Sequence, residues 1–379
     1  ILEPAIQTAK SGAIINNAHE YLFKILDPIL SHTKTGEILF KPNGKTIKAG
    51  ERFKNPDFAN YLEQIIVEGS NFLYNGDLTD KIDDYMKDGG LLTREDLSNY
   101  EVIERTPLKT DFNGKTIITN PMPSPGGTLI AFALKIISKK FPGEKIDNRL
   151  LTLGMRLAQI ARSEIISTKN RKNSLAEILS PSYFKRYLDL FDYEISLKPN
   201  KEKPGSGSTT HMSIIDSQGN AASVTTTNGE GCGYIIPGTG IMMNNILGEE
   251  DLNPDGFHNW ETTKRMSTMM SPTIVIGDSG PELVLGSGGS NRIRSAIKQV
   301  IVNKFTKNMN LEEAIQAPRI HLEENIIHCE SGINTAKLIF PWSTIHHWHE
   351  KNLFFGGVNA VTPTNAVGDP RRSGYGLVC

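Results

Sequence analysis

The sequence of 379 residues has little cysteine, no surplus of charge of either sign and no long apolar run. Its three cysteines, Cys232, Cys329 and Cys379, lie far apart without a CxxC pair, which argues for ordinary thiols over a disulfide framework or a zinc knuckle. The 41 Lys and Arg residues balance the 42 Asp and Glu residues, so no basic excess is present to hold a nucleic-acid backbone. No apolar run approaches the roughly 20 residues of a membrane-spanning helix. We therefore expect no membrane span, no nucleic-acid partner, no metal and no cofactor.

The sequence changes in character near residue 200. Residues 1–198 are mostly helical in pattern, and the apolar spacing of 58–76 predicts a helix that ends at Gly76. Residues 199–208 carry no apolar side chain other than proline, which predicts an exposed, flexible loop. Short strand patterns and further helices follow. This order favours helices that cover the faces of a mainly antiparallel sheet system.

A β-hairpin is predicted around the turn Asp216–Asn220, where Gly219 supplies the left-handed conformation of a three-residue loop. The register that follows from this turn, good to about one residue because bulges are common beside such loops, places Thr209 opposite Thr227. Threonine is a favoured strand residue, and cross-strand Thr pairs stabilise hairpins modestly. A purely structural role therefore explains the pair as readily as a chemical one.

A threonine becomes a nucleophile when a base accepts its proton. The residue's own α-amino group is such a base, because its pKa lies near ~8. Thr209 is internal, so it has this amine only if the chain is cut between Ser208 and Thr209. The loop 199–208 is a place where such a cut can be accommodated. Thr227 would then hydrogen bond the Thr209 hydroxyl and hold it in position.

Several further motifs occur in a fixed order along nearly the whole chain. In the first half they are Gly89-Gly90-Leu91-Leu92-Thr93, Glu104-Arg105-Thr106-Pro107 and Pro121-x-Pro123-Ser124-x-Gly126-Gly127. In the second half they are Thr209-Thr210-His211, Pro237-Gly238-Thr239-Gly240, Met269-Met270-Ser271-Pro272, Gly286-Ser287-Gly288-Gly289-Ser290 and Gly368-Asp369-Pro370-Arg371. Together they resemble the motifs of the gamma-glutamyltransferase (gamma-glutamyltranspeptidase) family. The chain resembles a divergent member of this family.

The resemblance implies an α+β fold, the αββα sandwich of the N-terminal-nucleophile hydrolases, with two stacked, mainly antiparallel sheets between helical layers. It implies that residues 1–198 form the large-subunit portion, 199–208 the processing loop and 209–379 the small subunit. Both pieces would belong to one fold, as a heterodimer cut from one chain, and a higher homo-oligomer stays open. Family members are often periplasmic or extracellular, but no leader pattern is present here, so the compartment stays undetermined.

The resemblance also implies an activity, in which Thr209 attacks a gamma-glutamyl amide, forms an acyl-enzyme and passes the acyl group to water or an amino acid. Thr227 matches the supporting threonine of the family. Gly288 and Gly289 match the residues whose amides stabilise the oxyanion. A Gly-Gly turn suits this role, because no Cβ blocks the approach of the backbone amides to the oxyanion. The substrate-binding positions correspond to Asn228, Glu249, Glu250, Asp251, Ser267 and Thr268.

The sequence departs from the family pattern in three places. The family has a further stretch before residue 1, with an Arg that pairs with the substrate carboxylate, and this stretch is not in the sequence. The loop after Asn228 is two residues shorter than is typical, and residues 248–254 replace an Asp-Asp-Phe pattern. These departures leave two alternatives open: a related acylase for another acyl amide, of the cephalosporin or glutaryl type, and an inactive, unprocessed homologue that binds a ligand.

Three other features invite a functional interpretation. The run His346-His347-x-His349-Glu350 lacks a second set of ligands, so we assign it to packing or the surface and not to zinc. The glycine-rich run 286–290 lacks the Gly-Lys-Ser/Thr of a nucleotide-binding loop. His211 falls on the same strand face as Thr209, where we favour a core histidine over a catalytic base because the α-amine already fills that need.

Overall fold

The computed structural model describes residues 1–167, 175–191, 209–249, 252–253, 256–260, 262 and 264–379. By their contacts these residues divide into two compact units, residues 1–104 with 230–245, and residues 105–229 with 246–379. The predicted cleavage point before Thr209 falls within the sequence span of the second unit, whereas the predicted processing loop 199–208 lies outside the described residues.

The first unit is built from short helices around small apolar clusters. Two-stranded ladders join β1 to β2 and β7 to β8. The segment 230–245 belongs here because Asn55 Nδ2 donates to Gly240 O at 2.9 Å and Thr33 Oγ1 donates to Gly233 O at 3.0 Å. Its elements are α1 Glu3–Ser11, β1 Ala13–Ile14, α2 Asn17–Ile25, α3 Asp27–Leu30, α4 Lys34–Phe40, β2 Arg52–Phe53, α5 Pro56–Glu68, α6 Asn71–Tyr74, α7 Asp77–Met86, α8 Arg94–Ser98, β7 Ile235–Ile236 and β8 Ile241–Met242.

The single helix predicted over 58–76 is wrong, because the structure has two helices there. The helix α5 ends at Glu68, and Gly69 follows with φ of 68°. Glycine enters this left-handed region at little cost and so stops the helix in spite of the continuing apolar spacing. A capping box starts α8: the Thr93 side chain accepts from the Asp96 amide, and the Asp96 side chain accepts from the Thr93 amide.

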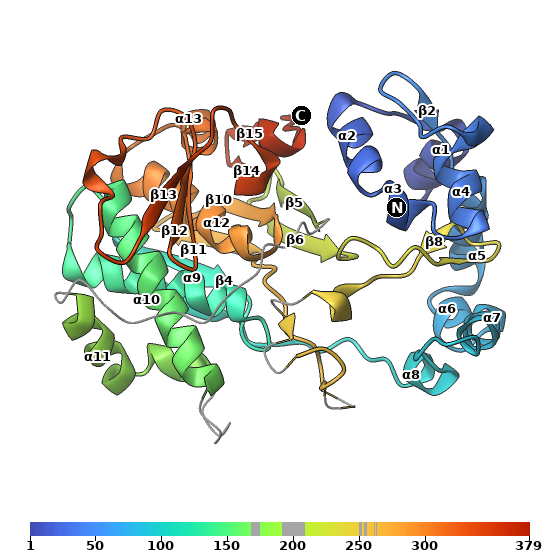
Figure 1. Cartoon of the computed structure of the whole chain (residues 1–379), viewed down its shortest axis with the longest axis horizontal. Coiled ribbons are helices and arrows are strands. Elements are labelled where there is room, and N and C mark those ends of the chain that lie inside the picture. The colour runs from blue at the N-terminus through green and yellow to red at the C-terminus, as the bar shows by residue number, and fades with distance from the viewer. Residues whose placement is uncertain (168–174, 192–208, 250–251, 254–255, 261, 263) are drawn as a thin grey trace. The chain divides into compact units, whose positions relative to one another are not determined.

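The second unit contains the site. Its six-stranded sheet has the strand order β15-β14-β10-β9-β4-β3, and every neighbouring pair is antiparallel. Figure 1 labels four of these strands, β4, β10, β14 and β15. The elements are β3 Leu108–Phe112, β4 Lys115–Thr119, α9 Pro125–Lys140, α10 Asn148–Ser167, α11 Pro181–Phe191, β5 Thr209–Ile215, β6 Ala221–Thr227, β9 Thr273–Gly277, β10 Gly280–Gly288, α12 Ile293–Thr306, α13 Leu311–Gln316, β11 Ile320–Glu323, β12 Ile326–Cys329, β13 Thr344–His347, β14 Gly357–Thr362 and β15 Asn365–Val367.

The strand β10 shows why the layers stack as they do. Its Leu283 and Leu285 join one large apolar cluster with α9, α10 and α12, so these helices cover one face of the six-stranded sheet. The alternate positions Gly286 and Gly288 point toward the β5–β6 hairpin, because a Cβ on either would meet residues of β5. Glycine in a strand interior permits this close approach of a second backbone. The order in this unit is therefore helices, sheet and hairpin.

Candidate active site

The hairpin that carries the predicted nucleophile has the expected register. Thr209 of β5 pairs with Thr227 of β6, and the pairing continues without a bulge to Ile215 and Ala221. Gly219 adopts φ of 83° in the turn, as predicted. The Asp216 carboxylate accepts from the backbone amides of Gln218 and Asn220 at 2.9 and 2.8 Å, which fixes the turn and with it the register.

The two threonine hydroxyls are in contact. Thr209 Oγ1 lies 3.2 Å from Thr227 Oγ1 and donates to it, and Thr227 Oγ1 also accepts from the Gly229 amide at 3.0 Å. Both side chains are half-buried, whereas Thr210 on the opposite face of the strand is exposed. The contact orients the Thr209 oxygen without enclosing it.

Gly288 lies directly against the nucleophile position. A Cβ built on Gly288 would stand 2.3 Å from Thr209 O. Because Thr209 O is a backbone atom, no side-chain rotation could relieve this clash. Gly289 follows with φ of 124°, in the region that favours glycine, and leads into the turn before α12. Ser287 Oγ donates to Gly288 O at 2.8 Å and accepts from the Gly357 amide at 3.1 Å, which holds this turn to β14.

His211 is a packed histidine. Its Nδ1 lies 2.8 Å from Thr225 Oγ1 and its Nε2 lies 2.8 Å from Ser213 Oγ, so hydroxyls of the hairpin occupy both ring nitrogens. Burial lowers the pKa of His211 to about 4, which keeps the ring neutral at physiological pH. The ring rests on Gly286, where a Cβ would meet it at 2.3 Å. The structure therefore places His211 in the core, as the sequence analysis favoured.

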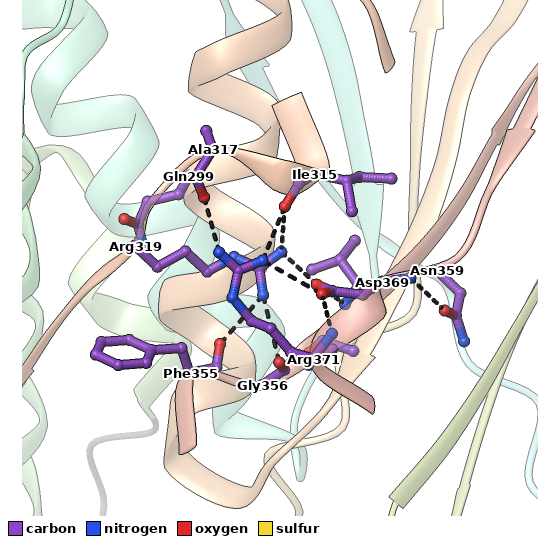
Figure 2. Close-up of polar contacts among 12 residues, drawn as sticks. Gln299, Ile315, Ala317, Arg319, Phe355, Gly356, Asn359, Asp369 and Arg371 are labelled. Carbon is purple, nitrogen blue, oxygen red and sulfur yellow. Dashed lines mark hydrogen bonds and ion pairs between the residues drawn. The ribbon is translucent and has the colours of Figure 1, made fainter. Parts of the chain in front are cut away.

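A buried cluster of charges surrounds Asp369 and Arg371, which belong to the motif Gly368-Asp369-Pro370-Arg371. Arg319 Nη2 lies 2.6 Å from Asp369 Oδ2, and Arg371 Nη1 lies 3.2 Å from Asp369 Oδ1. Arg371 also pairs with Glu330 through two contacts of 2.7 and 2.5 Å. Figure 2 shows both guanidinium groups directed at Asp369. Burial opposes ionisation of Asp369, but Arg319 and Arg371 outweigh it and hold the pKa of this carboxyl below its usual value.

Asn359 of β14 links this charge cluster to the nucleophile strand. Its Oδ1 accepts from the Asp369 amide at 3.3 Å, and its Nδ2 donates to His211 O at 3.0 Å. Its own carbonyl accepts from Ser213 Oγ at 3.2 Å. Only the β10–β14 register, which sets Asn359 opposite Gly286, shows that this residue faces β5.

Separate contacts place the predicted substrate-binding residues. Asn228 is exposed directly after β6. Ser267 is half-buried, and Thr268 is held beside the start of α9, where Ser124 Oγ donates to Thr268 O at 2.9 Å. Glu249 is half-buried in a turn whose carbonyls accept from Asn253 Nδ2. The predicted residues Ser208, Glu250 and Asp251 lie outside the described residues. The structure thus brings together Thr209, Thr227 and Gly288, and local hydrogen bonds hold the main chain at Thr268 and Glu249.

Other functional classes find little support within the described part of the chain. The three cysteines are free thiols there. No group of three His, Cys, Asp or Glu side chains among the described residues is arranged to hold a metal ion. The His346 ring packs on Trp348 at 5.5 Å and on His328 at 5.2 Å, which agrees with a packing role. None of the described helices combines the length and apolar character needed to cross a membrane.

Comparison with known proteins places this geometry in context. The chain is 31% identical over 348 residues to the glutathione hydrolase proenzyme of Escherichia coli (strain K12). This match covers 85% of this chain and 60% of the relative. It is 30% identical over 386 residues to the acylase ACY 1 proenzyme of Pseudomonas sp. (strain SE83). That match covers 95% of this chain and 67% of the relative. The chain thus spans about 60% of the length of the first of these relatives.

A solved structure confirms the predicted fold. The crystal structure of cephalosporin acylase from Bacillus halodurans superposes with a TM-score of 0.84 at 22% identity and covers 99% of this chain and 73% of that chain. The fold is the N-terminal-nucleophile hydrolase sandwich, with helices and mainly antiparallel sheets, in which the β5–β6 hairpin forms a two-stranded sheet of its own. The sequence profile described as gamma-glutamyltranspeptidase matches residues 1–379. The chain belongs to the gamma-glutamyltranspeptidase family.

Proposed function

We propose that this chain is part of a self-processing threonine amidohydrolase or acyltransferase that cleaves gamma-glutamyl amides such as those of glutathione-like compounds. The observation that carries the proposal is the position of Thr209. It begins β5, its hydroxyl donates to Thr227, and its backbone lies against Gly288. Family membership and a relative named glutathione hydrolase proenzyme support the same reaction class.

The first step is the hydrolysis of the peptide bond between Ser208 and Thr209. One water is consumed, Ser208 gains a carboxylate and Thr209 gains an α-amine. Residues 1–198 then belong to the large subunit, 199–208 are the tail left by processing, and 209–379 form the small subunit. The two pieces remain a heterodimer. This step matters chemically because the new amine is a base of suitable pKa next to the hydroxyl that it must deprotonate.

In turnover the Thr209 amine accepts the hydroxyl proton while Oγ1 attacks the γ-carbonyl carbon of the substrate. The Thr227 hydroxyl orients Oγ1, and the amides of Gly288 and Gly289 stabilise the oxyanion, an effect worth about 3 kcal/mol for each donor in comparable sites. The proton passes to the leaving amine as the amide C–N bond breaks and an ester to Thr209 remains. Water or the amine of an amino acid then attacks this ester and restores the hydroxyl.

Substrate recognition is assigned to the residues around this centre. An α-amino group calls for a carboxylate, which Glu249, Glu250 or Asp251 supplies, and an α-carboxylate calls for hydroxyl donors, which Ser267 and Thr268 supply. We assign Asn228, which is exposed directly after β6, to hydrogen bond the same amino-acid end of the substrate.

An acylase for a different acyl amide is the second candidate. Residues 248–254 depart from the family's Asp-Asp-Phe pattern, and a relative named acylase ACY 1 proenzyme is 30% identical to this chain, against 31% for the glutathione hydrolase proenzyme. The ratio of kcat/KM for a gamma-glutamyl anilide to that for a glutaryl anilide separates the two. A ratio well above one supports the gamma-glutamyl reaction, and a ratio well below one supports the acylase.

The decisive experiment compares the unaltered protein with Thr209→Ala. We expect the unaltered protein to run as two bands on a denaturing gel, the smaller with Thr209 at its N-terminus, and to hydrolyse the anilide. Thr209→Ala should run as one band without turnover, whereas Thr209→Ser should retain part of both activities. Thr210→Ala, on the exposed face, is the matched control and should behave as the unaltered protein. A single intact band from the unaltered protein would favour the inactive binding homologue.

A further inference from the structure

A polar junction joins the start of α9 to the segment that carries the candidate residue Thr268. The Ser124 hydroxyl lies 2.9 Å from Thr268 O and 2.8 Å from Met270 O, so it shares its one proton between two carbonyls. Asn120 Nδ2 donates to the same Met270 O at 2.9 Å. Hydrogen bonds from side chains therefore hold the main chain on both sides of Met269.

Ser124 does not have the ordinary role of a serine at a helix start. It is the N-cap residue of α9, a position where a serine side chain commonly accepts from an amide of the first turn. Its side chain makes no such hydrogen bond with the described amides of α9. Ser124 is 4% exposed, and its hydroxyl is directed at the two carbonyls of the segment 268–270. The hydroxyl thus holds this segment and does not cap the helix.

The same segment leaves the Thr268 hydroxyl available as a donor. Thr268 Oγ1 accepts from the Met270 amide at 3.2 Å. Among the described residues, none accepts a hydrogen bond from this hydroxyl. Thr268 is half-buried, so its hydroxyl can still reach a bound molecule. A carboxylate is the strongest acceptor that an amino-acid substrate offers to such a donor.

The Met270 amide links the orientation of the Thr268 hydroxyl to Ser124. Peptide groups are planar and rigid, and Ser124 fixes the planes that contain Thr268 O and Met270 O. Between them, the Met269 side chain is 3% exposed and packs in the large apolar cluster. The amide that sets the position of Thr268 Oγ1 lies between these fixed points. Loss of the Ser124 hydroxyl would therefore free the Thr268 side chain to turn.

We propose that Ser124 is a positioning residue for substrate recognition, which aims the Thr268 hydroxyl at the α-carboxylate of the acyl donor. This inference rests on the proposed gamma-glutamyl function, in which Thr268 binds that carboxylate. The side-chain hydrogen bonds of Ser124 end on the segment 268–270 and not on Thr209 or Thr227. Ser124 therefore acts on substrate affinity. Binding that is equal in the ground state and the transition state changes KM and leaves kcat as it is.

Steady-state kinetics on a gamma-glutamyl anilide test this role. Ser124→Ala should raise KM about fivefold, the effect of one hydrogen bond, with kcat and self-processing unchanged. Ser295→Ala is the matched control and should leave KM unchanged. Ser295 of α12 is 5% exposed, and its hydroxyl also has two partners, Met155 Sδ and His321 Nδ1. An unchanged KM in Ser124→Ala, a loss confined to kcat, or an equal rise of KM in the control would overturn the assignment.

A double-mutant cycle shows whether the effect passes through Thr268. Thr268→Val removes the donor and should raise KM more than about tenfold, because a hydrogen bond to a carboxylate is stronger than one between neutral groups. Ser124→Ala should then add nothing, so the double variant should have the KM of Thr268→Val. A further rise of about fivefold in the double variant would show that Ser124 acts independently of Thr268 and would overturn the proposal.

Crystals of the unaltered, processed protein soaked in glutamate, the product of hydrolysis, need no variant and are independent of any folding defect. We expect the α-carboxylate to accept from Thr268 Oγ1 while Ser124 Oγ remains on Thr268 O. A carboxylate bound away from Thr268 would overturn the inference and leave the gamma-glutamyl function standing. Failure of the unaltered protein to hydrolyse the anilide would instead overturn that function, and this inference with it.

Discussion

The Thr209–Thr227 pair and the Arg319–Asp369–Arg371–Glu330 cluster are two polar assemblies of the second unit that are built in opposite ways. The threonine pair is neutral, half-buried and joined by one hydrogen bond of 3.2 Å. The ion cluster is charged and fully buried, and its Arg371 carries paired contacts to Glu330. A nucleophile must reach the substrate and change its protonation state, so few hydrogen bonds should restrain its hydroxyl. A framework needs the opposite, and buried, hydrogen-bonded ion pairs supply it.

Asn359 connects the two assemblies. It contacts Asp369 through Oδ1 and the main chain of His211 through Nδ2. His211 stands two residues from Thr209 on the same face of β5. We infer that the ion cluster positions the nucleophile strand, while the threonine pair sets only the final orientation of one hydroxyl.

The largest effect on stability is expected from Asp369→Asn. It leaves Arg319 and Arg371 without part of their buried counter-charge, and breaking such a pair typically costs about 3–5 kcal/mol. We expect a loss of this size in the free energy of unfolding, measured by denaturant titration. Glu282→Gln is the control, because the Lys115–Glu282 pair at 2.7 Å is partly exposed, and it should change stability far less. Equal losses in both variants would show that burial of the cluster has no special value.

The next effect is expected in catalysis, from Gly288→Ala. The new methyl group would meet Thr209 O, so the nucleophile or the β10 backbone must shift. We expect processing and kcat to fall by about 100-fold, or about 3 kcal/mol, because misplacement of reacting groups by an ångström has effects of this order. Gly154→Ala on α10 meets only the tip of the Ile137 side chain and should leave kcat unchanged. Normal processing in Gly288→Ala would remove Gly288 from the site.

A smaller effect comes from His211, whose folded pKa of about 4 lies below the unfolded value near 6.5. Because the fold prefers the neutral ring, its contribution is fully present above pH 6.5 and is lost as the pH falls toward 4. The expected loss is about 2 kcal/mol at pH 5. Unfolding free energies of the unaltered protein and His211→Gln between pH 7.5 and 5 measure it. His321 and His328 also have lowered pKa values and titrate in the same direction, so the difference between the two slopes is the relevant quantity.

The smallest effect is expected from Thr227→Val, which keeps the shape of the side chain and removes its hydroxyl. Thr209 then loses one orienting hydrogen bond, worth about 1 kcal/mol, so kcat should fall about fivefold at an unchanged KM. Thr227→Ser should restore the rate, and Thr226→Val on the exposed face should not alter it. A hundredfold loss in Thr227→Val would mean that Thr227 does more than orient Thr209.

Local sequence rules were sufficient for part of the site. The turn residues Asp216 and Gly219 determine the loop, and the strict alternation of a strand then fixes Thr209 opposite Thr227. They failed at 58–76, where apolar spacing continues through Gly69 although the backbone there leaves the helix.

The sequence by itself determined the hairpin and its register, because these depend on residues close together along the chain, whereas the role of Thr209 as candidate nucleophile is implied by motifs spread over nearly the whole chain. Only the tertiary structure decided that Gly288 abuts Thr209 and that Asn359 joins Asp369 to β5. Each of these relations pairs residues from distant segments. Burial and the partners of a charge are properties of the packed chain, which no local pattern of residues specifies.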